Sequence, residues 1–219
     1  SFMGSAQDHK RVGENETGPN TGGMGAYSPA PIINKGLEKK IIKKIVKPTL
    51  EALKEKNHPY TGFLYVGLMI KNNEPYLIEY NVRMGDPECQ VIMPRLKTDL
   101  VQLINASVQN KLKNVTIKWS KKKCMTVVLC SKGYPTKKIF NKRINLHRVS
   151  LRKNTFIFHA GTKIKNGLLF SNGGRVLNIV VLGNTFLKIR NEIFKIIKII
   201  DWSFGFFRRD IGWRVIKKK

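Results

Sequence analysis

The stretch that decides the fold is Leu77-Ile-Glu-Tyr-Asn-Val-Arg-Met-Gly-Asp-Pro-Glu88. Its first half is typical of a β-strand, in which successive side chains alternate between the two faces. Glu79, Asn81 and Arg83 would then project from one face and the apolar residues between them from the other. Because a carboxylate among apolar neighbours costs free energy to bury unless it is paired or bound to a metal, the pattern indicates a site.

Glu79 and Asn81 offer the oxygen ligands that Mg²⁺ prefers, and this ion usually takes only one or two ligands from protein. Arg83, one step along the same face, can neutralise phosphate charge through two parallel hydrogen bonds. A bare Glu-x-Asn-x-Arg would more often be a strand end with a surface ion pair. The turn that follows adds two more carboxylates, Asp86 and Glu88, and therefore favours a metal and phosphate site.

A second candidate site lies upstream, in a glycine-rich opening segment that we expect to be a long structured loop. Its glycines allow close approach of the backbone, so that amide N–H groups can face an anion. The glycine spacing matches neither a Walker A loop nor a dinucleotide-binding fingerprint, and a flexible surface loop would look similar. The candidates for substrate or phosphate contacts here are Asp8, His9, Lys10, Arg11, Asn20, Thr21, Gly22, Gly23 and Gly25.

Around these motifs the first half contains two helical patterns and a hairpin. Two strand-like runs, 62–70 and 75–81, are joined by a polar turn. A helix is predicted from Leu37, and Pro48 should kink or interrupt it. A second helix is predicted from about Thr98. Its expected buried face comprises Leu100, Leu103, Ile104 and Val108.

The polar segment 111–123 reads as the boundary to a second domain. Beyond it we expect a buried strand at 125–130 and further strands near 155–159 and 175–182. Thr185 can cap a following helix. The apolar residues of that helix follow its period closely and are expected in the core: Phe186, Ile189, Ile193, Ile196, Ile197 and Ile200.

Several polar residues of the second half are expected to have mainly structural roles. Arg175, after a glycine turn, either pairs with a carboxylate or reaches a site, where it would contact substrate or phosphate. His159, at a strand end, is interpreted as structural. Asp210, Trp213 and Arg214 are expected to fasten the last strand.

The composition excludes some classes of protein. No apolar stretch of the 219 residues approaches the ~18 that a membrane-spanning helix needs, so no membrane partner is expected. Three cysteines without a CxxC pair indicate neither a disulfide framework nor a zinc site, and fit the cytoplasm.

The net charge of +27 is the unusual number, and it is unevenly distributed. Residues 1–110 hold 14 basic and 11 acidic side chains, a net of +3, so the remaining 27 basic and 3 acidic side chains give residues 111–219 a net of +24. Clustered Lys and Arg can bind nucleic acid. The aromatic residues, however, sit in apolar runs rather than between the lysine clusters, so we favour compositional drift and do not expect specific nucleic-acid binding.

Seven segments together resemble one enzyme family, the phosphoribosylamine–glycine ligases (glycinamide ribonucleotide synthetases) of the ATP-grasp superfamily. Their order along the chain is the family's order, and the match runs from about Gln7 to Arg214. The opening-loop motif is specific to this ligase, whereas a metal-binding Glu-x-Asn on a strand is shared across the superfamily. The segments are Gln7–Arg11, Thr17–Pro29, Tyr60–Tyr65, Glu79–Glu88, His159–Thr162, Asn172–Val176 and Asp210–Arg214.

The resemblance implies an α/β fold: the distal part of an ATP-grasp domain at 1–115, then a small α+β domain at 116–219. It implies ATP-dependent ligation of glycine to 5-phosphoribosylamine in purine biosynthesis, with Mg²⁺ or Mn²⁺ as the metal. Glu79 and Asn81 would be the metal ligands. Arg83 and Lys10 would contact phosphates or substrate during the reaction.

The resemblance covers only the C-terminal half of that enzyme, so we expect a fragment without turnover of its own, or a partner of a polypeptide that supplies the other half. The strand 62–70 lacks the second acidic metal ligand of many ATP-grasp enzymes, and residues 1–6 fit the family poorly. Two alternatives stay open. One is a basic nucleic-acid-binding module on a remnant ligase scaffold, and the other is a different ATP-grasp carboxylate–amine ligase.

Overall fold

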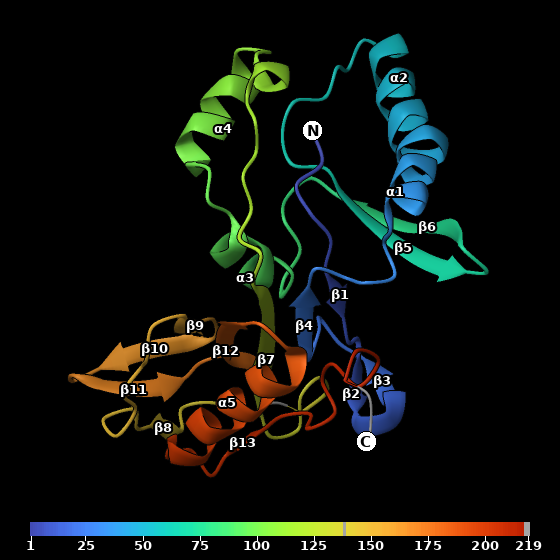
Figure 1. The fold of residues 1–219 in the computed structure, drawn as a ribbon. Helices are drawn as coiled ribbons and strands as arrows, with labels where there is room; N and C mark the ends of the chain where they lie inside the picture. The colour runs from blue at the N-terminus through green and yellow to red at the C-terminus, as the bar shows by residue number, and fades with distance from the viewer. Residues whose placement is uncertain (138, 217–219) are drawn as a thin grey trace. The chain divides into compact units, whose positions relative to one another are not determined.

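The computed structural model describes residues 1–137 and 139–216 of the chain (Figure 1). It contains both helices and sheets, and the expected α/β class is confirmed. Contacts divide the chain into two compact units, each discontinuous in sequence. Unit 1 comprises Ser1–Met3, Ala30–Gly85 and Leu96–Trp119, and unit 2 comprises Gly4–Pro29, Asp86–Arg95 and Ser120–Lys219. The division into domains 1–115 and 116–219 stays a prediction. Residues 138 and 217–219 of the second domain lie outside the described part of the chain.

In unit 1, the predicted helical region is one rod with a change of pitch. It consists of α1 (Lys35–Ile41), a π-helical segment (Ile42–Val46) and α2 (Lys47–Glu55). The Asn34 side chain caps α1 by accepting a hydrogen bond from the Leu37 amide at 2.9 Å. Pro48 lies directly after the π-helical segment, and without an N–H it can donate no helical hydrogen bond. The expected interruption is therefore present as the π-helical segment.

The predicted hairpin is confirmed as β5 (Tyr65–Lys71) and β6 (Glu74–Asn81), an antiparallel pair. Asn72 and Asn73 both have positive φ, as a two-residue hairpin turn requires. Lys40 of α1 bonds the Glu74 carboxylate at 2.5 Å, and the hydroxyls of Thr49 and Tyr80 share a hydrogen bond. These contacts tie the helical rod to the hairpin.

The helix predicted from Thr98 is α4 (Leu100–Val108), capped by the Asp99 side chain. Its buried residues are Leu103 and Ala106. Ile104 is 42% and Val108 68% exposed, so their assignment to a buried face was wrong. The helix is apolar around much of its circumference, so periodicity did not indicate which narrow stripe packs.

Unit 2 is built on an antiparallel sheet with the strand order β1–β4–β7–β12–β9. β13 pairs with β7 off this path. The opening segment expected as a loop thus contributes two strands, because β4 pairs with the buried β7. The strands are β1 (Gln7–Asp8), β4 (Gly25–Ser28), β7 (Lys123–Ser131), β12 (Arg175–Gly183), β9 (Thr155–His159) and β13 (Gly205–Phe206).

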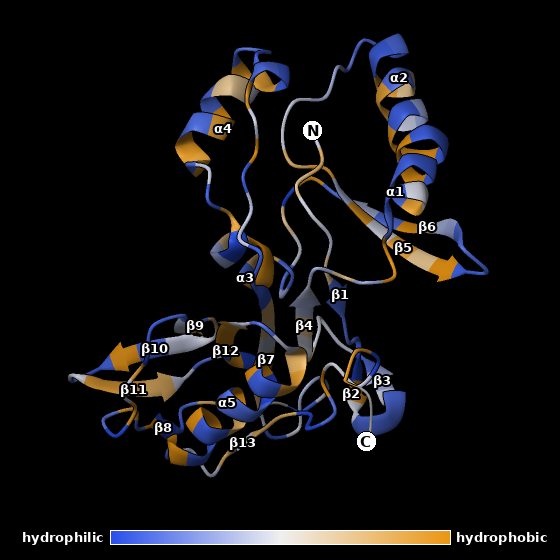
Figure 2. Cartoon of the chain, in the orientation of Figure 1, coloured by the Kyte–Doolittle hydropathy of each residue, from blue (hydrophilic) through white to orange (hydrophobic). Residues whose placement is uncertain are grey.

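Helices cover the two faces of this sheet. α5 (Phe186–Ile199) starts at the Thr185 cap, as predicted, and buries Phe186, Ile189, Ile193 and Ile196. Hydrophobic and hydrophilic stretches alternate along it (Figure 2). The short helix α3 (Cys89–Ile92) packs through Val91 on the opposite face, against Ala26, Cys124 and Val180.

Short elements complete unit 2. They are β2 (Arg11–Gly13), a 3-10 turn (Glu14–Glu16), β3 (Thr17–Asn20), a 3-10 turn (Met93–Arg95), β8 (Arg143–Ile144), β10 (Thr162–Lys165) and β11 (Leu168–Ser171). In unit 1, a 3-10 turn (Leu112–Asn114) follows α4. Within the described residues, none of the helices has the length and apolar character needed to cross a membrane.

Candidate functional site

The candidate metal ligands lie on β6 in unit 1. Glu79 pairs across the hairpin with Gly67, and Asn81 with Tyr65. A Cβ atom at Gly67 would lie 2.8 Å from Cγ of Glu79, which shows that the Glu79 side chain occupies the space above that glycine. The glycine therefore permits Glu79 to lie across the hairpin, with its carboxylate exposed.

The oxygen donors of these two residues suit a magnesium ion. The Glu79 carboxylate and the Asn81 amide oxygen lie at neighbouring positions on one face of the strand, so both can coordinate the same ion. No group of three or more His, Cys, Asp or Glu that could hold a metal occurs among residues 1–137 and 139–216. An ion here would take its other ligands from water and phosphates. Arg83 follows the strand, is exposed, and donates to the Met84 carbonyl at 2.9 Å.

Unit 2 brings a different part of the predicted site together, around the glycine segment. Arg175 donates to the carbonyls of Gly22 at 2.9 Å and Asp86 at 2.8 Å. It also pairs with the Asp86 carboxylate at 2.8 Å. The alternative in which Arg175 pairs with a carboxylate is therefore confirmed. The Asp86 carboxylate also accepts a hydrogen bond from the Gln90 side-chain amide at 2.7 Å. Glu88, at the start of α3, is buried.

The amides of this segment are largely engaged within the protein. The Gly22 amide donates to the Tyr134 hydroxyl and the Gly23 amide to the Thr21 hydroxyl, both at 2.9 Å. Thr21 in turn donates to the Lys10 carbonyl at 2.7 Å. The Gly22 and Gly23 amides therefore do not face an open anion site.

The glycines serve close packing instead. A Cβ at Gly23, whose φ is +119°, would meet Pro87 at 2.5 Å. A Cβ at Gly25 would meet the Thr126 carbonyl oxygen of β7 at 2.7 Å. Substitution at either position would require the backbone to shift.

The charged residues of the opening segment have separate positions. Lys10 pairs with Asp8 at 2.6 Å, and both side chains are partly exposed. Arg11 is exposed and donates to the Gly18 carbonyl at 2.8 Å, while Asn20 is its partner across the β2–β3 pair. Lys10 and Arg11 are thus accessible to an anion.

His9 is fully buried, and its Nε2 accepts a hydrogen bond from the Gly212 amide at 3.2 Å. Burial, assisted by the nearby Arg208 charge, lowers the pKa of His9 to about 4. It is therefore neutral at pH 7, and it does not face a site that a substrate could enter.

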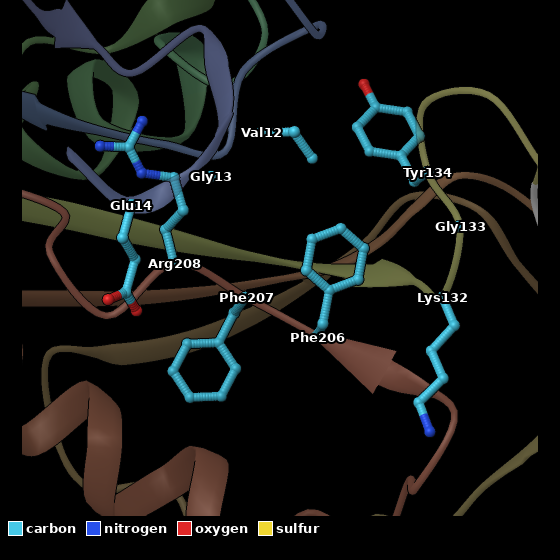
Figure 3. A pocket seen from close by; sticks show the side chains of 9 residues that line it. All are labelled: Val12, Gly13, Glu14, Lys132, Gly133, Tyr134, Phe206, Phe207 and Arg208. Carbon is cyan, nitrogen blue, oxygen red and sulfur yellow. The ribbon is translucent and has the colours of Figure 1, made fainter. Parts of the chain in front are cut away.

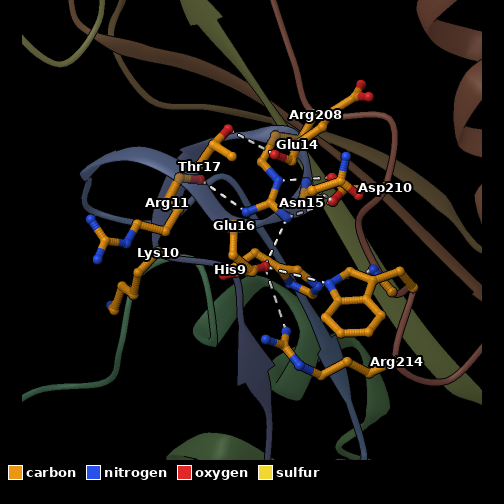
Figure 4. Close-up of polar contacts among 12 residues, drawn as sticks. His9, Lys10, Arg11, Glu14, Asn15, Glu16, Thr17, Arg208, Asp210 and Arg214 are labelled. Carbon is orange, nitrogen blue, oxygen red and sulfur yellow. Dashed lines mark hydrogen bonds and ion pairs between the residues drawn. The ribbon is translucent and has the colours of Figure 1, made fainter.

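An ion-pair cluster that sequence reasoning missed lies next to His9 (Figure 4). Arg208 is 1% exposed and pairs with Glu16 and Asp210, each at 2.8 Å, and it donates to the Arg11 carbonyl at 3.0 Å. Arg214 adds a contact to Glu16 at 3.6 Å. Burial alone would raise the pKa of Asp210, but hydrogen bonds from Arg208 and the Asn15 amide hold it below its ordinary value.

This cluster changes the interpretation of the C-terminal residues. Asp210 and Arg214 do fasten the chain, as predicted, but to the Glu14–Glu16 turn rather than to a last strand. The partners are about 195 residues apart in sequence, so no local pattern could have revealed them. Weak signals were the isolated acidic residues Glu14, Glu16 and Asp210 in a strongly basic chain.

The chain matches two domain models of one family. Residues 1–89 match the ATP-grasp (A) domain of phosphoribosylglycinamide synthetase, and residues 124–214 match its C domain. The phosphoribosylamine–glycine ligase of Brucella melitensis is 44% identical over 218 residues, which cover 99% of this chain and 51% of that protein. The chloroplastic enzyme of Arabidopsis thaliana is also 44% identical, over 98% of this chain and 41% of its own length.

One solved structure gives the same assignment, and a second shows a likeness of fold. The phosphoribosylamine–glycine ligase of Thermotoga maritima superposes with a TM-score of 0.82 at 34% identity, covering 94% of this chain and 50% of that one. The biotin carboxylase subunit of a pyruvate carboxylase superposes with a TM-score of 0.60 at 13% identity, a likeness of fold alone. The chain thus spans about half the length of the relatives that it matches.

Proposed function

Because the chain belongs to the phosphoribosylglycinamide synthetase family, we propose that it contributes to the ATP-dependent ligation of glycine to 5-phosphoribosylamine. In this reaction ATP would transfer its terminal phosphoryl group to the glycine carboxylate, and ADP would be the leaving group. The amine of phosphoribosylamine would then attack the acyl phosphate, giving glycinamide ribonucleotide and releasing phosphate. The observation that carries the proposal is the pair Glu79 and Asn81, on a strand within the segment matching the ATP-grasp domain.

The chain's own residues would bind and orient charged groups rather than act as a nucleophile. Such a reaction is promoted mainly by positioning the reactants and by stabilising the developing negative charge. The exposed Arg83 would hold phosphate or carboxylate oxygens at the end of β6. Lys10 and Arg11 would contribute positive charge from the opening segment, and Arg175 would hold the Gly22 backbone and the Asp86 turn in place.

A magnesium ion bound by Glu79 and Asn81 would supply neutralisation of phosphate charge. Mn²⁺ has similar ligand preferences and could replace it. Glu79 is the single carboxylate proposed as a ligand, so the ion would be held weakly until ATP brings its own oxygens.

We place the reaction in the cytoplasm, since the three cysteines are free and two of them are buried. The remaining half of the relatives' length would come from further polypeptide, whether covalently joined or separate. Glycine-dependent ADP release is therefore expected only when that half is present.

The test measures ADP release that requires both glycine and phosphoribosylamine. The 219-residue chain is assayed alone and together with the N-terminal half of a relative. Turnover is expected in the combined sample, and Glu79→Gln should reduce it by about a hundredfold or more, since the ion loses its only carboxylate ligand from the protein.

Glu51→Gln is the matched control, because Glu51 is an exposed glutamate of α2 and is not one of the proposed ligands. It should leave turnover unchanged. Full activity of the Glu79→Gln protein would show that the metal assignment is wrong. Turnover by the isolated chain would contradict the need for the other half.

A further inference from the structure

A cavity of about 460 Å³ lies in unit 2, and neither of the proposed metal ligands is among the residues that line it (Figure 3). Its volume falls in the range typical of small-molecule sites. Aromatic and apolar side chains form much of its wall, and glycine leaves the backbone accessible at two places. The lining residues are Val12, Gly13, Glu14, Lys132, Gly133, Tyr134, Phe206, Phe207 and Arg208.

The wall has a flat, apolar part. In the view of Figure 3 the Phe206 ring lies below the neighbouring side chains of Val12 and Tyr134, and the Phe207 ring lies below and to the left of Phe206. The Tyr134 hydroxyl is already bonded by the Gly22 amide at 2.9 Å, so the ring is held in position. Such a wall suits a planar ring, because aromatic side chains prefer offset or edge contacts with other rings.

The charged residues that line the cavity differ in whether they already have a partner within the protein. Arg208 is neutralised by Glu16 and Asp210, and a Glu14 carboxylate oxygen accepts from the Arg209 amide at 3.1 Å. Lys132, by contrast, forms no ion pair with any carboxylate of the described residues. It is therefore the cation of this cavity that an anionic ligand can engage.

A second lysine shares an aromatic ring with Lys132. Both Lys132 and Lys142 lie over the ring of Phe204, with Nζ at 5.8 Å and 4.4 Å from its centroid. Lys142 likewise pairs with no carboxylate in the part of the chain that the structure describes. Two like charges sharing one ring repel each other, and a phosphate group would relieve that repulsion.

We propose that this cavity binds a nucleoside monophosphate, with its base against Phe206 and its phosphate at Lys132 and Lys142. The site uses none of the proposed metal ligands and is independent of the proposed ligase reaction. A mononucleotide is favoured over a nucleic-acid strand, because an open cavity of this size offers its aromatic wall to a single base and not to a series of stacked bases.

The test is a titration of the complete 219-residue chain with AMP in the absence of divalent metal. Amide NMR shifts map the site, and calorimetry gives the affinity. Shift changes are expected at residues 12–14, 132–134 and 204–208. Lys132→Gln combined with Lys142→Gln should weaken AMP binding at least tenfold. Lys132 is exposed and Lys142 is half-buried, and neither forms an ion pair with a carboxylate of the described residues, so the fold should be retained.

Lys198→Gln is the matched control, because Lys198 is an exposed lysine of α5 outside the cavity. It should bind AMP as the unmodified chain does. Glu79→Gln should also bind AMP normally, which separates this site from the proposed ligase site. Ribose 5-phosphate should bind at least tenfold more weakly than AMP, since it lacks the base.

Four results would overturn the proposal. They are equal AMP affinity in the double lysine variant, equal affinity for ribose 5-phosphate, loss of AMP binding in Glu79→Gln, and shift changes confined to residues outside the cavity. Much tighter binding of a single-stranded oligonucleotide than of AMP would instead assign the surface to nucleic acid.

Discussion

Arg208 joins the opening segment of unit 2 to its C-terminal segment. Its guanidinium contacts Glu16, Asp210 and the Arg11 backbone from a fully buried position. Arg208→Met would leave two partly buried carboxylates without their main partner. We expect the free energy of unfolding to fall by about 3 kcal/mol, measured by urea denaturation.

The neighbouring Arg209 provides the control for this experiment. Its side chain is exposed, and its backbone amide donates a hydrogen bond to the Glu14 carboxylate. Arg209→Met should therefore change the free energy of unfolding by less than about 0.5 kcal/mol. Equal effects of the two substitutions would mean that the cluster contributes nothing specific.

His9 should make stability depend on pH. Its pKa falls from 6.5 to about 4 on folding, so the unfolded chain binds a proton over this interval that the folded chain does not. Stability is then fully present above pH 6.5 and declines as the pH falls toward 4, by at most about 3 kcal/mol. The lowered pKa values of Glu16 and Asp210 add losses of the same sign at lower pH.

His9→Gln keeps an acceptor for the Gly212 amide but cannot titrate. The free energy of unfolding of this variant should change less between pH 6.5 and 4 than that of the unmodified protein. The exposed histidines are common to both proteins, so they cancel in the difference. Parallel pH profiles would show that His9 is not the titrating group.

Among the elements, α5 illustrates what a local pattern can predict. Its cap and its start follow from Thr185, and four of the six residues expected in the core from the 3.6-residue period are buried. The other two, Ile197 and Ile200, are only partly buried against the same core. α4 illustrates the limit, since its apolar residues surround much of the helix and only contacts decide which are buried. Exposed Ile104 and Val108 could not be identified from spacing alone.

The Thr185 cap gives a test at this scale. The Thr185 hydroxyl accepts from the Lys188 amide at 3.3 Å, so Thr185→Ala leaves that amide without its partner. We expect a loss of about 1 kcal/mol in the free energy of unfolding. Asn184→Ala, one residue outside the cap, should have little effect. A thermal or urea denaturation series on both variants measures the difference.

At the scale of the whole molecule, the two units differ in their cores. Both hydrophobic core clusters belong to unit 2, whereas the buried apolar residues of unit 1 are only Ala30, Leu37, Leu103 and Ala106 among those described. A unit with few buried apolar contacts opens more readily. The amides of β5 and β6 should therefore exchange with solvent faster than those of β7 and β12.

Native-state hydrogen exchange followed by mass spectrometry or NMR checks this directly. The expected result is protection near the global stability for β7 and β12, and at least tenfold faster exchange for the β5–β6 hairpin. Uniform exchange across both units would mean that they unfold as one cooperative body.

The sequence by itself determined the α/β class, the family, the hairpin and the major strands of unit 2, because these depend on motifs and periodicities within short windows. It also placed Glu79 and Asn81 on one strand face. Only the tertiary structure decided that the opening segment joins the C-terminal sheet, that Arg208 pairs with residues almost 200 positions away, and that Lys132 and Lys142 share the Phe204 ring. Those contacts depend on how distant segments pack, and that information is absent from any local window.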